Sequence, residues 1–299
     1  DIHSSDKLNL FRQELERMGF RMLAPDINRS GPCFTVEPVA DGELAVRYAL
    51  AAIKNVGAGA MEAMTADRDA NGPFKDIGDL SRRLDPRHVN KRPLENLIRA
   101  GALDSLDQNR RRLFESSDVI LRHANAEVAA RESNQTNLFG DAETMPSFDL
   151  PPIDDWLPLE RLQHEFEAIG FYISAHPLDS YVTSLRRLDV TRFADLATWL
   201  QGRPTNRARL AGIVISRQER TSARGNRFAF VQFSDSSGVF EATVFSDQLF
   251  SARQLLEPGR MVVITADARH EEDSFRLTLQ TIEPIDEATR NAAAGLKVF

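Results

Sequence analysis

Gly57, Ala58 and Gly59 interrupt a helical pattern that resumes at once in the residues that follow. Glycine permits positive φ angles and carries no side chain, so a phosphate group can approach the backbone N–H groups at the start of the next helix. The turn is therefore expected to bind the phosphates of a nucleic-acid backbone without recognising the base sequence. The alternative is a tight helical corner that binds nothing.

The segments on both sides of this turn determine whether its backbone N–H groups are exposed. Residues 41–55 are expected to form the preceding helix, with these apolar residues on one face: Leu44, Tyr48, Ala51 and Ala52. After the turn, the small residues Ala60 and Ala63 allow close packing of the second helix. This order predicts a helix–hairpin–helix.

A second unit of the same kind is expected further along the chain. One helix should run from Pro93 to about Arg99, and the next should start near Gly101, the single glycine of this turn. With one glycine, this copy is expected to be the degenerate one. Residues 108–131 predict a longer helix whose weakly apolar last third is exposed. Together, residues 41–131 predict a tandem helix–hairpin–helix module.

The charge distribution also favours a polyanionic partner. The formal charge is −7, but acidic residues concentrate in 113–202, whereas 41–112 and 203–269 have an excess of Lys and Arg. Basic blocks in an acidic chain favour contact with a polyanion, although ordinary solvated faces give the same pattern. The candidates in the first block are Lys54, Lys75, Arg82, Arg83, Lys91 and Arg92.

From residue 208 the apolar pattern changes to a period of two, which is typical of strands. A helical insert, 246–256, separates the third strand candidate from the fourth. Five strands with a helix in this place are the order of an OB-fold barrel. The strand candidates are 208–216, 228–234, 240–245, 261–268 and 275–282.

Aromatic and basic side chains on this expected barrel could bind a single strand of nucleic acid. Phe228 and Phe230 share one face of the second strand, and Phe233 lies on the other face. Aromatic faces stack on bases and arginines contact phosphates, whereas a buried Phe belongs only to the core. The arginines at the end of the first strand and in the next loop are Arg217, Arg220, Arg224 and Arg227.

The stretch QTNLF places two adjacent large apolar residues, Leu138 and Phe139, in an acidic segment that is rich in proline. Residues 132–158 have the composition of a linker, so no core lies near this pair in the sequence. The pair therefore has no obvious core to join in its own segment, unless it packs against the long helix 108–131.

The remaining composition narrows the classes of function. No apolar run approaches the roughly 20 residues of a membrane helix, and the single cysteine, Cys33, excludes a disulfide framework and fits a reducing cytosol. The six histidines are scattered without metal-ligand or catalytic spacing, and His176 is expected to have a structural role at a helix end. The sequence begins without Met or a leader-like segment, so we expect a piece of a longer protein.

Five separate stretches resemble one known family, the alpha subunit of bacterial DNA polymerase III, which is the C-family replicative polymerase. They occur in that family in the same order, and the resemblance covers almost the whole chain. The resemblance implies an α+β multidomain fold, in which a helical tandem helix–hairpin–helix module is followed by a five-stranded OB-fold β-barrel. The stretches are GFRMLAPDINRSGPCFTVEP, RYALAAIKNVGAGAMEA, NGPFKDIGDLSRRLDPRHVNKRPLENLIRAGALDSL, GFYISAHPLD and the strand-rich block.

The resemblance also implies a division into domains. Residues 1–40 correspond to the end of a fingers domain, and 41–131 to the tandem DNA-binding module. An acidic linker with a clamp-binding peptide occupies 132–158, a connecting helical segment occupies 159–202, and the OB-fold domain occupies 203–299.

The resemblance implies an activity for the complete protein, which is template-directed DNA synthesis, a nucleotidyl transfer in which palm aspartates hold magnesium. No stretch of this chain resembles the palm, so we expect neither a cofactor nor polymerisation in this part. The implied partners are double-stranded and single-stranded DNA, the sliding clamp (beta subunit) and other holoenzyme subunits, in the cytoplasm and without a membrane. In the family a QxxLF-type peptide docks into the clamp, and Gln135, Leu138 and Phe139 match it position by position.

Other functions remain open at this point. The same two folds occur in stand-alone nucleic-acid-binding modules of DNA repair, and an error-prone C-family polymerase would have a similar segment. A protein-interaction scaffold without DNA contact is a third alternative. A DNA ligase would need a nucleotidyl lysine in a KxDG context, which the sequence lacks.

Overall fold

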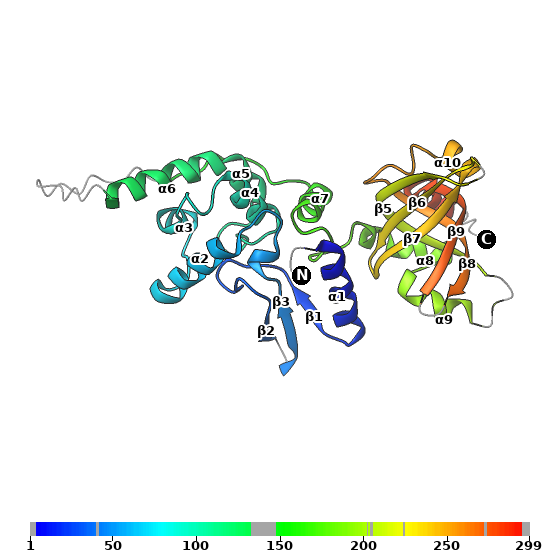
Figure 1. Ribbon diagram of the computed structural model, residues 1–299, viewed down its shortest axis with the longest axis horizontal. Helices are drawn as coiled ribbons and strands as arrows, with labels where there is room; N and C mark the ends of the chain where they lie inside the picture. Colours follow the sequence, from blue (N-terminus) through cyan, green and yellow to red (C-terminus); the bar gives the residue numbers. More distant parts are fainter. Residues whose placement is uncertain are drawn as a thin grey trace, which may run out of the picture. The chain divides into compact units, whose positions relative to one another are not determined.

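The computed structural model describes residues 4–39, 42–132, 148–201, 203, 206–223, 225–271 and 274–294. The chain forms two compact units, Asp1–Ser174 and Ala175–Phe299. Their boundary falls inside the expected connecting segment 159–202. Figure 1 shows the first unit as mainly helical and the second as a barrel of strands.

The first unit combines one small sheet with several helices. The sheet has the strand order β1 (Arg21–Leu23), β3 (Leu44–Arg47), β2 (Thr35–Pro38), and β3 is parallel to β1 and antiparallel to β2. The helices are α1 (Ser5–Arg17), α2 (Ala58–Asn71), α3 (Ile77–Arg83), α4 (Lys91–Arg99), α5 (Arg110–Glu115), α6 (Ser117–Glu132) and α7 (Pro158–Ile169).

The prediction of a helix over residues 41–55 is wrong. This segment forms β3 and a single 3-10 turn, Leu50–Ala52. The side chains of Ala45, Tyr48 and Ala49 are all fully buried, so the segment has no polar face. In a continuously buried segment, apolar residues occur at helical spacing and at every other spacing. The pairing of β3 with β1 and β2 then overrides the helical pattern.

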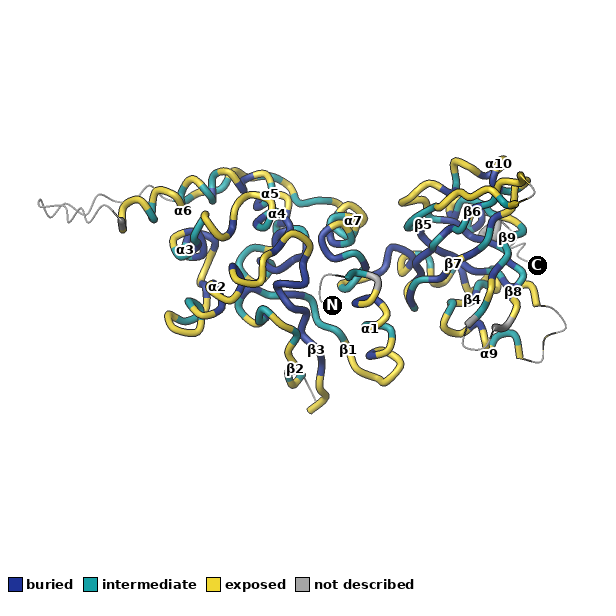
Figure 2. Tube along the Cα trace, viewed as in Figure 1, coloured by how far each residue is buried: buried dark blue, intermediate teal, exposed yellow. Residues whose placement is uncertain are grey.

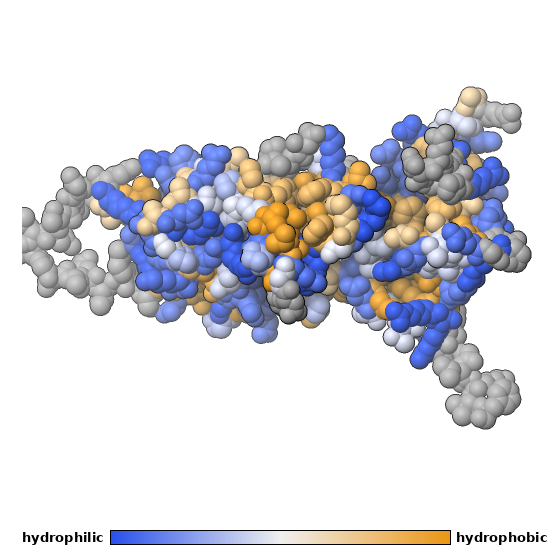
Figure 3. Space-filling model, turned by 90° about the horizontal axis from the view of Figure 1, so that it is seen from below, coloured by the Kyte–Doolittle hydropathy of each residue, from blue (hydrophilic) through white to orange (hydrophobic). Residues whose placement is uncertain are grey.

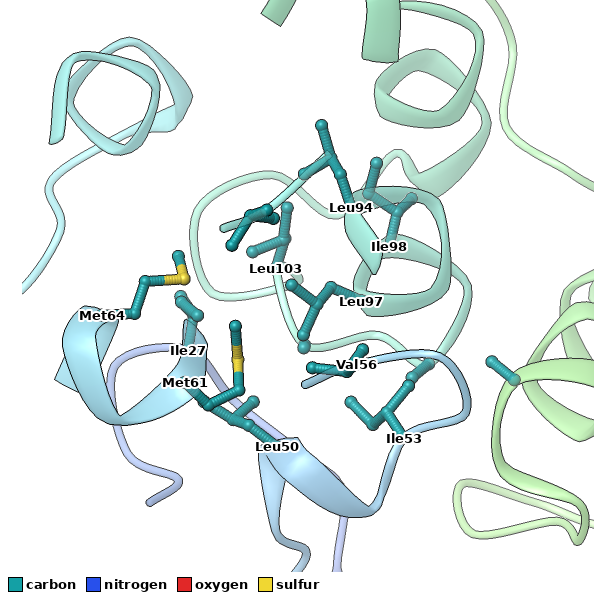
Figure 4. Packing of buried hydrophobic residues seen from close by; sticks show 14 of the residues in the cluster. Ile27, Leu50, Ile53, Val56, Met61, Met64, Leu94, Leu97, Ile98 and Leu103 are labelled. Atoms are coloured by element: carbon teal, nitrogen blue, oxygen red, sulfur yellow. The ribbon is translucent and has the colours of Figure 1, made fainter. Parts of the chain in front are cut away.

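The core of the first unit joins the two hairpin regions. Figure 4 shows Met61 of α2, Val56 of the first turn and Leu97 of α4 packed together, with Leu50 beside Met61. Met61, Leu50 and Leu97 are fully buried, and each such side chain stabilises the fold by about 1.5–3 kcal/mol. The position of the first turn is therefore fixed by the same core that fixes α4.

The second hairpin differs from the sequence-based prediction. Gly101 has a φ of +80°, and the next helix, α5, begins at Arg110 instead of near Gly101. A Cβ atom at Gly101 would lie 2.1 Å from the guanidinium of Arg110. Glycine is needed here for its backbone conformation and because the arginine fills the space beside it.

Arg110 forms a buried ionic network with the end of the first unit. Its guanidinium donates to both Asp104 oxygens, at 2.8 and 2.7 Å, and lies 3.6 Å from Glu165 of α7. Glu165 is 1% exposed and accepts hydrogen bonds from the backbone N–H groups of Ile173 and Ser174 at 2.8 and 2.9 Å. Two buried charges of opposite sign therefore hold the last residues of this unit in place.

Part of the expected linker is packed against the first unit. Asn109 donates to the carbonyl oxygen of Ile153, and the side chain of Asp155 accepts from the N–H of Arg111 and from Arg161. The charge of Asp155 is therefore used within the fold. The last third of α6 is largely exposed, as expected (Figure 2).

The second unit is a closed barrel. The strand order is β5–β6–β7–β9–β8, and β8 pairs back onto β5, so the sheet closes on itself. This is the OB-fold order, with the helix α10 (Ser246–Ser251) between the third and fourth strands. The strands are β5 (Arg207–Thr221), β6 (Arg227–Asp235), β7 (Gly238–Phe245), β8 (Met261–Glu271) and β9 (Ser274–Pro284).

Burial alternates along the barrel strands, as the period of two predicts (Figure 2). Phe233, Val231 and Ala229 of β6 face the core. The short strand β4 (Val190–Thr191) extends the sheet by pairing in parallel with β5. The other elements of this unit are a 3-10 helix Pro177–Tyr181, α8 (Val182–Arg187), a second 3-10 helix Phe193–Asp195, α9 (Leu196–Leu200) and α11 (Ile285–Ala294).

Candidate nucleic-acid interface

The first hairpin turn leaves the start of α2 open. Asn55, with a φ of +63°, makes the left-handed bend, whereas Gly57 is extended at a φ of −79° and precedes the first residue of α2. The positive φ angles expected at Gly57 and Gly59 are therefore absent. No heavy atom lies within 4 Å of a Cβ built on either glycine, and α2 begins without a side-chain cap. The N-terminal end of α2 can therefore be approached by an anion.

Beside this turn lies a basic hollow of about 610 Å³. It contains three of the cations expected from sequence to contact phosphate, Lys54, Lys91 and Arg92. These residues come from the turn and from α4, so the core that joins the hairpins also brings these charges together. The residues that line the basic hollow are Lys54, Asn55, Lys91, Arg92, Glu95, Asn96, Arg99 and Glu167.

The cations of the basic hollow differ in how strongly they are held. Lys91 donates to Asp118 at 2.7 Å, and this hydrogen bond raises the pKa of Lys91. Lys54 donates to the carbonyl oxygen of Glu167 at 3.1 Å, and Asn96 donates to the carbonyl oxygen of Lys54. The side chain of Arg92 is exposed. The hollow therefore combines two lysines that are held by hydrogen bonds with the exposed side chain of Arg92.

The other basic candidates of this unit lie elsewhere. Arg83 donates to Asp67 and Asp79 and its guanidinium lies 4.2 Å from the ring centre of Phe74, so it stabilises the fold. Arg82 lies 3.6 Å from Asp79, and Lys75 is exposed. None of these side chains lines the basic hollow.

The aromatic pair of the barrel lies on its outer surface. Phe228 and Phe230 are half-buried with ring centres 5.4 Å apart, and the guanidinium of Arg220 lies 5.5 Å from the ring of Phe230. Phe245 of β7 pairs in register with Phe228 and is 53% exposed. Phe245 was not predicted from the sequence, because the register that sets it beside Phe228 comes from strand pairing.

The four arginines expected near these rings do not form one cluster. Arg220 pairs in register with Phe228 and lies on the aromatic face, but Arg217 pairs with Val231 and therefore points to the other face. Arg217 donates to the carbonyl oxygen of Arg253 and its side chain is only 19% exposed. Arg227 precedes Phe228 in β6 and points away from it. Arg224 lies outside the described residues.

The sequence also singles out the QTNLF stretch and His176. Gln135, Leu138 and Phe139 lie outside the described residues. His176 precedes a 3-10 helix, where its Nδ1 accepts from the N–H of Leu178 at 3.2 Å and its Nε2 lies 3.1 Å from the Ser234 hydroxyl, which confirms a structural role. In the part of the chain that the structure describes, no three His, Cys, Asp or Glu side chains come together as metal ligands would.

Comparison with known proteins identifies both modules and the family. A helix-hairpin-helix motif model matches residues 19–113, and a model of an OB-fold nucleic acid binding domain matches 208–285. The DNA polymerase III subunit alpha of Caulobacter vibrioides is 40% identical over 298 residues, which cover 100% of this chain. The chain belongs to the DNA polymerase III alpha subunit family.

Other relatives agree with this assignment. The DNA polymerase III subunit alpha of Pseudomonas fluorescens is 33% identical over 319 residues and also covers 100% of the chain. The chain spans 26% of the length of each of these two relatives. Among solved structures, the mitochondrial single-stranded DNA-binding protein Rim1 of S. cerevisiae matches 27% of this chain and 95% of its own chain, with 22% identity and a TM-score of 0.23, which is too low to support an inference.

The resemblance to the DNA polymerase III alpha subunit is thus confirmed, and so are the helical module and the five-stranded barrel. The family description that matches the barrel names nucleic acid binding, and the OB-fold architecture is one that binds oligonucleotides. Within the described ranges, every helix is too short or too polar to span a lipid bilayer.

Proposed function

We propose that this chain is the DNA-holding and clamp-tethering part of a replicative DNA polymerase III alpha subunit. The observation that carries the proposal is the basic hollow, in which Lys54, Lys91 and Arg92 meet beside the open start of α2. Cations and free N–H groups at one place suit a phosphate backbone and carry no base preference. The module holds duplex DNA in this way, with Gly57, Ala58 and Gly59 closest to the backbone.

The barrel supplies a second contact, to single-stranded DNA. Phe228, Phe230 and Phe245 form an aromatic strip on the outer surface of the second and third strands, where OB-folds bind oligonucleotides. Arg220 beside this strip provides a positive charge for the backbone. A primer terminus in a polymerase site has duplex DNA on one side and single-stranded DNA on the other. The two contacts therefore suit one substrate.

The complete protein carries out the nucleotidyl transfer, and its palm holds the magnesium ions. This chain takes no cofactor of its own and acts in the cytoplasm with the other holoenzyme subunits. Gln135, Leu138 and Phe139 bind the sliding clamp, which encircles the same duplex. The match over the whole chain to alpha subunits favours this reading over a stand-alone repair module or an error-prone polymerase.

Residues 1–40 belong to the end of the fingers domain in this proposal. Large apolar side chains are exposed on α1 and the small sheet, and Figure 3 shows apolar residues gathered on the face of the first unit seen from below. Exposed apolar groups of this kind mark interaction surfaces. The exposed residues are Leu10, Phe11, Met18, Phe20, Val36 and Leu44.

Replacing Gly57 and Gly59 with glutamate tests the first contact. Both side chains would extend into open space, so the fold should be kept while two negative charges meet the phosphates. We expect duplex affinity, measured by fluorescence anisotropy, to fall at least about tenfold, which corresponds to about 1.4 kcal/mol. The control is Ala66→Glu with Ala70→Glu, which adds the same charge at exposed positions further along α2. Equal losses for both pairs would contradict a local contact at the turn.

Replacing Arg220 with glutamine tests the barrel contact. If Arg220 pairs with one phosphate of a single strand, the slope of log K against log salt should become shallower by about 0.7. Arg217→Gln is the matched control, because Arg217 points to the other face and should leave the slope unchanged. The measurement is an anisotropy titration of a labelled oligothymidylate against the full chain at several salt concentrations. A change in slope for Arg217→Gln alone would place the contact on the opposite face.

A further inference from the structure

Arg99 is the last residue of α4, and its guanidinium is held in the basic hollow with few partners. It lies 4.7 Å from the ring centre of Phe114, which fixes its position. Among the described residues, its buried Nε has no hydrogen-bond partner. A guanidinium has five N–H donors, so this one has unused capacity for an anion. Its side chain is 26% exposed, which leaves it accessible from the hollow.

Glu167 of α7 faces Arg99 within the same hollow. A carboxylate oxygen of Glu167 lies 3.8 Å from Nη1 of Arg99, too far for a hydrogen bond, and the glutamate is 43% exposed. The same carboxylate is 3.4 Å from Nδ1 of His164. Burial lowers the pKa of His164, so this ring is neutral near pH 7 and Arg99 is the cation that faces Glu167. The pair is therefore loose, exposed and open to exchange.

We infer that Arg99 is a phosphate-contacting residue of the basic hollow and that Glu167 is the counter-ion which a DNA phosphate displaces. The inference rests on the proposed function and adds a residue and a means of setting affinity. Arginine binds phosphate through two parallel N–H donors, whereas Glu167 offers only a distant charge. Phosphate therefore replaces the carboxylate by making hydrogen bonds that the free protein lacks.

Glu167→Gln in the full chain tests the counter-ion. It removes the competing charge and keeps the size of the side chain and the carbonyl oxygen that Lys54 contacts. We expect a labelled DNA duplex to bind about threefold to tenfold more tightly, as loss of a nearby like charge at a partly exposed site predicts. Glu95→Gln is the matched control, since Glu95 lines the same hollow and the change in net charge is the same.

Arg99→Gln tests the phosphate contact, and the double variant tests the coupling. Arg99→Gln should weaken duplex binding by about tenfold, as the loss of a charge-assisted pair predicts, and Glu167→Gln should have no further effect in that background. Arg99→Lys should restore part of the affinity. A thermal melt shows whether each variant is folded. On addition of inorganic phosphate, the Nε–H signal of Arg99 in a nitrogen-15 NMR spectrum should move.

The outcomes of these experiments separate the counter-ion role of Glu167, the phosphate contact of Arg99 and the proposed function. An equal gain for Glu95→Gln and Glu167→Gln, or a gain from Glu167→Gln that persists without Arg99, would overturn the counter-ion role. Duplex binding with a static Arg99 Nε–H signal would overturn this inference and leave the proposed function standing. A wild-type chain that binds no duplex DNA would refute the proposed function itself, whether or not free phosphate moves the signal.

Discussion

Leu138→Ala combined with Phe139→Ala is expected to abolish measurable binding of the chain to its sliding clamp. Both side chains act as buried anchors in the proposed complex, and the loss of such an anchor costs on the order of 2 kcal/mol or more. The free energy of unfolding should change by no more than about 0.5 kcal/mol, as for surface substitutions. Calorimetric titration against the clamp and a thermal melt of the same preparation measure the two effects.

Phe148→Ala with Leu150→Ala is the matched control for this experiment. These apolar residues lie further along the same acidic stretch, but they pack against the core of the first unit. The control should lower the melting temperature and leave clamp binding intact. If the Leu138 and Phe139 variant behaves like the control, the pair serves packing and the proposed clamp contact is wrong.

Arg110→Ala should destabilise the first unit more than any other single substitution considered above. It leaves Glu165, which is 1% exposed, without its cationic partner, and it empties the space beside Gly101. Removing one partner of a buried ion pair costs about 3–5 kcal/mol. The measurement is chemical unfolding monitored by circular dichroism.

Arg112→Ala provides the comparison in the same helix. Arg112 pairs with Asp107 at 2.6 Å, but its side chain is 34% exposed, so its loss should cost about 1 kcal/mol or less. Similar losses for the two variants would show that burial of the Arg110 network contributes little. A loss confined to Arg110→Ala would establish it as the main ionic support of the first unit.

The barrel was predictable because its signal is local. Apolar residues alternate along each strand, and turn residues separate the strands, so both the order and the inserted helix follow from the sequence. Residues 41–55 were not predictable in this way, because Tyr48 and its neighbours are buried on all sides and carry no periodic signal. The helix expected to start near Gly101 is absent, because a turn with a positive φ at Gly101 occupies this place. The helix expected over 108–131 is present as α5 and α6.

The candidate site was also predictable from the sequence only in part. Lys54, Lys91 and Arg92 were found from composition near the two turns, and the structure places all three around one hollow. Arg99 was missed, because a basic residue at a helix end is usually explained by the helix dipole alone. Only the tertiary position of Phe114 and Glu167 distinguishes it from an ordinary helix-terminal arginine.

Glu165 also has a mechanical consequence. Its carboxylate binds the N–H groups of Ile173 and Ser174, and it faces Arg110, which donates to the carbonyl oxygen of Arg99. Tension applied to the chain beyond Ser174 is therefore transmitted through side chains to α4 and α5, and does not simply unravel α7 from its end. Amide hydrogen exchange at Ile173 and Ser174 should accordingly be as slow as in the helices behind them.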